Sequence, residues 1–198
     1  MKRFGILLTG YCAIGAIVIP AFIQPVPRLV WNLSASVPVG LYAARPAHSA
    51  SRGDLVAAYA PATVAELMAA RGYLPRRVPM LKHVMGVAGQ RVCRTGTSVS
   101  IDGKPLAEAR SRDRKGRPLP AWSGCRALRL GEVFLLNPAS ADSFDGRYFG
   151  PVPASGIVAV LEPLWLPGGD LAGPASASAR RETSPDVTAQ GDSHDQHR

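Results

Sequence analysis

Cysteine, histidine and acidic residues are scarce in this sequence, and their scarcity excludes several classes of function. The 198 residues include three cysteines and four histidines, and no two cysteines have the C-x-x-C spacing of a zinc site. Lys and Arg outnumber Asp and Glu by 23 to 14, which gives a net charge of +9. The basic residues nevertheless form no basic helix and are not interleaved with aromatic residues, so we expect no nucleic-acid partner. We also expect no metal or other cofactor.

Helical patterns are rare as well, because 20 glycines and 18 prolines interrupt the chain. Short apolar or alternating runs, each bounded by Gly, Pro, Asn or Asp, indicate strands. They are GLYAARP, GDLVAAYAP, PMLKHVMGVAG, RVCRTGTSVSIDGKPL, GEVFLLNP and GIVAVLEPLWLP. Asp102-Gly103 predicts a hairpin turn. Only residues 61–71 have helical periodicity, and Gly72 is the stop. We therefore predict a mainly β domain, a twisted barrel or sandwich with one short helix.

One long apolar run predicts where the chain is located. Residues 4–23 contain no charge and follow Lys2 and Arg3. About 20 apolar residues cross a bilayer, whereas the apolar part of a cleaved signal peptide has about 7–15. We therefore favour a transmembrane anchor over a cleaved signal. The basic N-terminus would lie in the cytoplasm and the rest outside, which in a bacterium means the inner membrane and the periplasm.

This anchor divides the chain into three predicted parts. Residues 1–33 comprise the cytoplasmic tip, the anchor and a connector whose Trp31 would lie at the lipid interface. Residues 34–166 form the folded domain. Residues 167–198 have few large apolar side chains, and we expect a disordered tail.

Two of the three cysteines lie in the exported part. An even pair in an oxidising compartment predicts a disulfide between Cys93 and Cys125. Closing a loop of about 30 residues would stabilise the fold by about 3 kcal/mol.

The stretch SASVPVGLY, residues 34–42, poses the question of function. A serine such as Ser36 is a poor nucleophile unless a base removes its proton. His48 lies in a Pro/Ala/Ser loop, and His83 is expected to point to the face opposite Lys82. Taken alone, Ser-x-Pro is most often only a turn.

A neutral lysine is the other possible base, and burial makes a lysine neutral by lowering its pKa. Lys104 follows a turn and Lys115 lies in a charged loop. Lys82 lies in an apolar strand, where it shares a face with Met80 and Val84. The alternative is an edge-strand lysine that reaches water past its neighbours.

Three ordered elements together resemble a known family. A serine shortly after an apolar span, a lysine that begins KHVMGVAG, and the box SFDGRYFG at residues 143–150 are similar to the signal peptidase I clan of Ser/Lys membrane proteases. The resemblance is greatest to the branch that serves plasmid conjugation, the TraF peptidases, and it covers residues 5–166. The segments that carry it include SVPVGLY, RGYLPRRVPMLKHV, VCR, GRPLPAWSGCR and GEVFLLNPASADSFDGRYFGPVP.

The resemblance implies a role for each site residue. Ser36 would be the nucleophile and Lys82 the general base. The hydroxyl of Ser34 would help to bind the oxyanion, and Ser143 would aim the lysine amine. The resemblance also places Asp145 in the active site.

Arg147 would be the ion-pair partner of Asp145. An acidic turn with a salt bridge is an equally good account of both residues. Since a carboxylate close to Lys82 would stabilise its ammonium, we expect Asp145 to order the loop that holds Ser143. The chain departs from the clan at His83, where Arg is common, and at Gly89-Gln90, where Gly-Asp is common.

The resemblance therefore implies a membrane-anchored serine endopeptidase that processes an exported precursor in plasmid transfer and type IV secretion. The substrate would be pilin-like, cleaved and in some members joined end to end. Two alternatives stay open: a housekeeping signal peptidase, and a non-catalytic, membrane-anchored assembly protein of a secretion channel.

Overall fold

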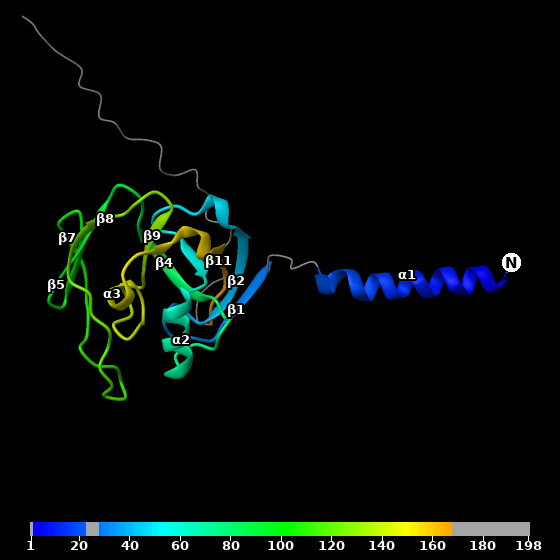
Figure 1. Cartoon of the computed structure of the whole chain (residues 1–198), viewed down its shortest axis with the longest axis horizontal. Helices are drawn as coiled ribbons and strands as arrows, with labels where there is room; N and C mark the ends of the chain where they lie inside the picture. The colour runs from blue at the N-terminus through cyan, green and yellow to red at the C-terminus, as the bar shows by residue number, and fades with distance from the viewer. Residues whose placement is uncertain (1, 23–27, 168–198) are drawn as a thin grey trace, which may run out of the picture.

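The computed structural model describes residues 2–22 and 28–167, and most of the folded part is β structure (Figure 1). A seven-stranded antiparallel sheet has the order β1-β2-β11-β3-β4-β9-β10. Its strands are β1 (Leu29–Asn32), β2 (Gly40–Pro46), β3 (Leu55–Ala58), β4 (Met80–Gly86), β9 (Glu132–Leu136), β10 (Val152–Pro153) and β11 (Ile157–Trp165). A four-stranded antiparallel sheet has the order β7-β6-β5-β8. It comprises β5 (Arg91–Thr95), β6 (Ser98–Ile101), β7 (Lys104–Glu108) and β8 (Gly124–Ala127).

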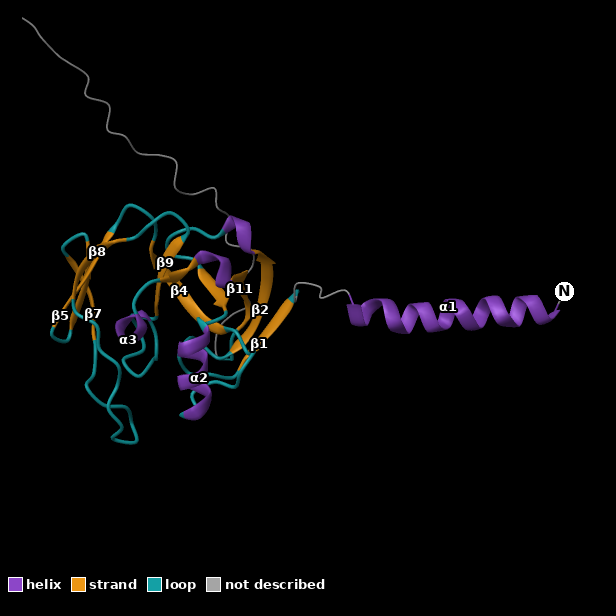
Figure 2. Ribbon diagram, viewed as in Figure 1, coloured by secondary structure: helices purple, strands orange, loops and turns teal. Residues whose placement is uncertain are grey.

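The helices are short apart from α1 (Lys2–Phe22) (Figure 2). The predicted helix is α2 (Ala62–Ala70), and a helix of four residues, α3 (Gly146–Phe149), follows the loop after β9. Two 3₁₀ turns, η1 (Ala47–Ser49) and η2 (Ala154–Gly156), complete the elements. The mainly β prediction is confirmed, whereas the expectation of a single short helix missed α3.

Alternation along β4 determines which side chains face the core. Met80, Lys82 and Val84 are buried, and the residues between them are partly exposed. Met80 and Val84 pack in one apolar cluster with Met68 of α2 and Leu135 of β9. The strand therefore holds Lys82 among apolar neighbours, as its sequence pattern predicts.

Two local predictions in the smaller sheet are confirmed. Asp102 and Gly103 both have positive φ and connect β6 to β7, which is the backbone of a tight hairpin. Cys93 on β5 lies opposite Cys125 on β8, and the two form a disulfide.

The sequence patterns missed three strands. Residues 29–32 were expected to belong to a connector, but β1 pairs along its whole length with β2. The predicted domain start at residue 34 therefore omits the edge strand of the sheet. Strands β8 and β10 are short and lack the apolar alternation that indicates a strand.

Two other predictions are not decided by the fold. In the part of the chain that the structure describes, no helix is long and apolar enough to cross a bilayer. The anchor at residues 4–23 therefore stays a prediction. The predicted disordered tail, residues 167–198, lies almost wholly outside the described residues.

Candidate active site

Lys82 is held in a setting that disfavours its charge. Its side chain is 4% exposed on the inward face of β4. Burial is the largest influence and lowers its pKa from 10.5 to about 8; the positive charge of Arg147 also lowers it, and the charge of Asp145 opposes both. About a tenth of the molecules therefore carry a neutral Lys82 amine at pH 7.

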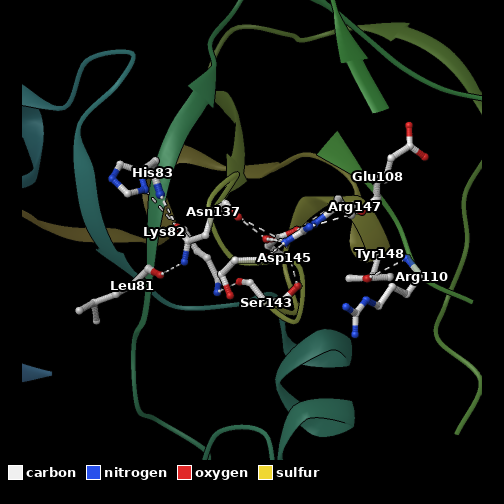
Figure 3. A network of polar contacts seen from close by, with 11 residues as sticks. Leu81, Lys82, His83, Glu108, Arg110, Asn137, Ser143, Asp145, Arg147 and Tyr148 are labelled. Carbon is white, nitrogen blue, oxygen red and sulfur yellow. Dashed lines mark hydrogen bonds and ion pairs between the residues drawn. The ribbon is translucent and has the colours of Figure 1, made fainter. Parts of the chain in front are cut away.

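Ser143 fixes the direction of this amine (Figure 3). Lys82 Nζ donates a hydrogen bond of 2.6 Å to Ser143 Oγ, and Ser143 is also buried. The resemblance implies an orienting role for Ser143, and this hydrogen bond is the contact through which Ser143 would act. This bond uses one hydrogen of Nζ, so the other positions on the nitrogen can point toward a group such as a nucleophile or a substrate.

Asp145 and Arg147 form a buried ion pair that organises the loop around Ser143. Arg147 Nε and Nη2 lie 2.9 and 2.8 Å from the two oxygens of Asp145, and both side chains are almost fully buried. Arg147 Nη2 also donates to the carbonyls of Ser140 and Ser143. Asp145 caps α3 by accepting a hydrogen bond from the Arg147 backbone N–H. The carboxylate thus bonds to Arg147 and to the backbone N–H of Asn137.

Gly146 lets α3 approach β9 closely enough for this arrangement. A Cβ atom at Gly146 would lie 2.7 Å from the Leu135 carbonyl oxygen and 2.8 Å from the Phe134 ring. A larger residue would push α3 away from β9.

Asn137 connects the lysine strand to the ion pair, and the sequence patterns missed it (Figure 3). Its Nδ2 donates to the Leu81 carbonyl at 3.0 Å, and its Oδ1 accepts from the His83 backbone N–H at 3.2 Å. Its own N–H donates to Asp145 Oδ2. The only sequence signal was a polar residue that directly follows the buried run of β9.

The predicted nucleophile lies in the loop between β1 and β2. Ser36 Oγ lies 3.2 Å from Ser34 Oγ, and Ser34 Oγ lies 2.8 Å from Asn32 Oδ1. Buried Val37 and a 2.6 Å hydrogen bond from Tyr42 Oη to the Pro38 carbonyl fix the second half of the loop.

One groove contains four of the predicted site residues, whereas Asp145 and Arg147 are not part of its lining. About 810 Å³ in volume, it is lined by Ser34, Ser36, Lys82 and Ser143, with an apolar wall that includes Leu74. Among the described residues, the hydrogen bonds of Ser36 Oγ and Lys82 Nζ run to Ser34 and Ser143 rather than to each other. Such bonds are often absent before substrate binds.

The histidine alternatives are not brought to Ser36. His83 lies on the opposite face of β4, where its Nδ1 is 3.2 Å from Asn137 Oδ1. His48 is exposed in η1. The geometry therefore favours Lys82 over either histidine as the partner of Ser36.

Comparison with known proteins identifies the family of this chain. Residues 1–165 match the family model for signal peptidase, peptidase S26. A probable conjugal transfer protein TraF from Sinorhizobium fredii is 40% identical over 141 residues, which cover 66% of this chain and 73% of the relative. A plasmid transfer protein TraF from Escherichia coli is 35% identical over 177 residues, which cover 83% of this chain and 98% of the relative.

A solved structure of a signal peptidase I from Enterococcus faecalis is also similar. It is 20% identical with a TM-score of 0.34, and the match covers 57% of this chain and 96% of that one. The family match over most of the chain and the extended similarity to TraF proteins lead to one conclusion: this chain belongs to the signal peptidase family, peptidase S26, and is related to its TraF conjugal transfer members.

Proposed function

We propose that this chain is a serine endopeptidase in which Ser36 is the nucleophile and Lys82 the general base. The observation that carries the proposal is a buried lysine amine of lowered pKa, aimed by Ser143, in the groove that also contains Ser36. Among the described residues Lys82 Nζ forms no ion pair with a carboxylate, and a purely structural lysine would gain little from burial beside a serine hydroxyl.

The reaction would be acyl transfer through a covalent intermediate. Neutral Lys82 takes the proton of Ser36 as its oxygen attacks the scissile carbonyl. The resulting oxyanion would be bound by the Ser36 backbone N–H and the Ser34 hydroxyl. The C–N bond then breaks, Lys82 gives its proton to the leaving amine, and the acyl group stays on Ser36.

The acyl group can then pass to either of two acceptors. Attack by water releases a shortened chain, whereas attack by the amino terminus of the same chain gives a cyclic product. Either acceptor loses a proton to Lys82 as it attacks the acyl carbonyl. The bond from that carbonyl to Ser36 Oγ then breaks, and Lys82 returns the proton to Ser36 Oγ.

The substrate we propose is an exported precursor, a conjugative pilin in plasmid transfer and type IV secretion. Similarity to conjugal transfer proteins supports this choice over general secretory precursors. An extended segment of the precursor would lie in the groove, with small side chains in shallow pockets.

We further propose an anchor in the bacterial inner membrane at residues 4–23, with the catalytic domain in the periplasm. The uncharged run after Lys2 and Arg3 supports this topology. A second feature supports membrane contact: Trp31 and Trp165 stack with ring centroids 5.6 Å apart, and both are exposed. Leu29 and Leu33 beside them are exposed too, which makes an apolar patch suited to a lipid interface.

The test is cleavage of a pilin precursor co-expressed with the full chain. Ser36→Ala and Lys82→Ala should each abolish cleavage, while the exposed control variants Ser111→Ala and Lys104→Ala should retain it. Full cleavage by either of the first two would refute the Ser/Lys mechanism. A folded wild type that cleaves neither this precursor nor a general secretory one would instead favour the non-catalytic assembly protein, and equal cleavage of both would favour a housekeeping peptidase.

A further inference from the structure

Asn32 makes several hydrogen bonds in the nucleophile loop, and the proposed function gives it no role. It is 5% exposed, at the end of β1 and four residues before Ser36. Its Nδ2 lies within hydrogen-bonding distance of three carbonyl oxygens of the loop, those of Ser34, Val37 and Pro38, at 2.9, 3.1 and 2.9 Å. The amide therefore holds the backbone on both sides of Ser36.

The orientation of this amide is fixed by its partners. Oδ1 accepts the backbone N–H of Ser34 at 2.9 Å, while Nδ2 faces carbonyl oxygens. Exchanging the oxygen and the nitrogen would place donor against donor and acceptor against acceptor. Oδ1 therefore faces Ser34.

This orientation sets the direction of the two hydroxyl hydrogens. Because Oδ1 can only accept, the 2.8 Å contact requires Ser34 Oγ to donate its hydrogen to Asn32. Ser34 Oγ then has only lone pairs to offer, so across the 3.2 Å contact Ser36 donates and Ser34 accepts. Before substrate binds, the Ser36 hydrogen thus points to Ser34.

We propose that Asn32 is a positioning residue for the nucleophile, one that holds the backbone around Ser36 and orients the hydroxyl hydrogens of Ser34 and Ser36. The proposal rests on the function proposed above. When a scissile carbonyl enters, the Ser34 hydrogen turns from Asn32 Oδ1 to the developing oxyanion, and the Ser36 proton passes to Lys82. Asn32 Oδ1 keeps the Ser34 N–H throughout, so the loop stays in place as the hydroxyls turn.

The proposal predicts a loss in turnover rather than in substrate binding. Displacing a nucleophile by about 1 Å can cost about 100-fold in rate. We therefore expect Asn32→Ala in the full chain to lower kcat about 10- to 100-fold and to leave KM within about twofold. The pH at which activity rises, set by Lys82, should not move. Gln90→Ala is the matched control, because Gln90 also bonds a backbone N–H and a side chain but lies outside the groove.

A double-mutant cycle with Ser34→Ala separates this role from a general loss of structure. Since Asn32 Oδ1 acts through Ser34, Asn32→Ala should cost less in kcat when Ser34 lacks its hydroxyl. An unchanged kcat in folded Asn32→Ala would overturn the proposal. Strictly additive effects in the cycle would overturn the part of it in which Asn32 orients the hydroxyl hydrogens.

A second variant and a prior measurement of wild-type activity ensure that the result can be interpreted even if Asn32→Ala does not fold. If Asn32→Ala does not fold, the nearly isosteric Asn32→Asp loses the amide hydrogens that hold the loop carbonyls, and its kcat must fall at unchanged KM; unchanged kcat there also overturns the proposal. Wild type and Ser36→Ala are measured first. Inactivity of the wild type refutes the proposed function, whereas normal turnover without the Asn32 amide refutes only this inference.

Discussion

The activity of this enzyme should increase with pH, because its proposed base is a lysine that must lose its proton. Only the neutral amine can accept the Ser36 proton. With a Lys82 pKa of about 8, the neutral fraction is about 1% at pH 6, half at pH 8 and about 90% at pH 9. We therefore expect kcat/KM to rise tenfold per pH unit below pH 8 and to level off above it, about 90-fold in all between pH 6 and 9.

The assay is cleavage of a precursor peptide without titratable side chains near the scissile bond, measured from pH 6 to 9.5 at constant ionic strength. Gln90→Ala is the control and should give the same profile. A flat profile, or one that still rises steeply above pH 10, would show that Lys82 is not the group that limits activity.

Three other results are expected from the same structure. Burying the amine lowers the Lys82 pKa below its ordinary 10.5, so unfolding takes up a proton between about pH 8 and 10.5, and stability rises with pH across that window. Lys82→Met removes this cost, and its free energy of unfolding at pH 7, measured with denaturant, should exceed that of the wild type by up to roughly 3 kcal/mol. Arg147→Met leaves the Asp145 carboxylate buried and unpaired, which should cost about 3–5 kcal/mol in denaturant unfolding, whereas the double variant with Asp145→Leu should recover part of the loss. Replacing Cys93 and Cys125 by serine should cost about 3 kcal/mol, and non-reducing mass spectrometry of the exported wild type should find the two linked, whereas free thiols on both would contradict the pairing.

Features that depend on a single strand or a single turn could be predicted from the sequence alone. Alternation along residues 80–86 gives the inward face of Lys82 directly, and Asp102-Gly103 gives a hairpin because few residues adopt that backbone. Ser36, Lys82 and Ser143 lie far apart in sequence but line one groove, and only the resemblance to a family related them to one another.

Contacts that depend on tertiary placement could not be predicted in this way. Asn137 reaches the Leu81 carbonyl from a distant part of the sequence. Asn32 reaches carbonyls of its own loop, whose irregular backbone no periodicity indicates. Strand β1 has only four residues and follows a proline-rich segment, so its own sequence does not indicate a strand. Its pairing with β2 can be recognised only once the position of β2 is known. Helix α3 is a single turn capped by Asp145, too short for any periodicity.

The short link between the proposed anchor and Ser36, part of which is taken up by β1, limits how far this enzyme can work from its point of attachment. Ser36 lies thirteen residues beyond residue 23, where the anchor would end, and a fully extended chain spans at most about 3.6 Å per residue, or about 47 Å in all. If the preceding helix is embedded in lipid as proposed, any peptide bond to be cut must come within that radius of the bilayer surface. Geometry alone would then select bonds close to the membrane, whatever residues surround them.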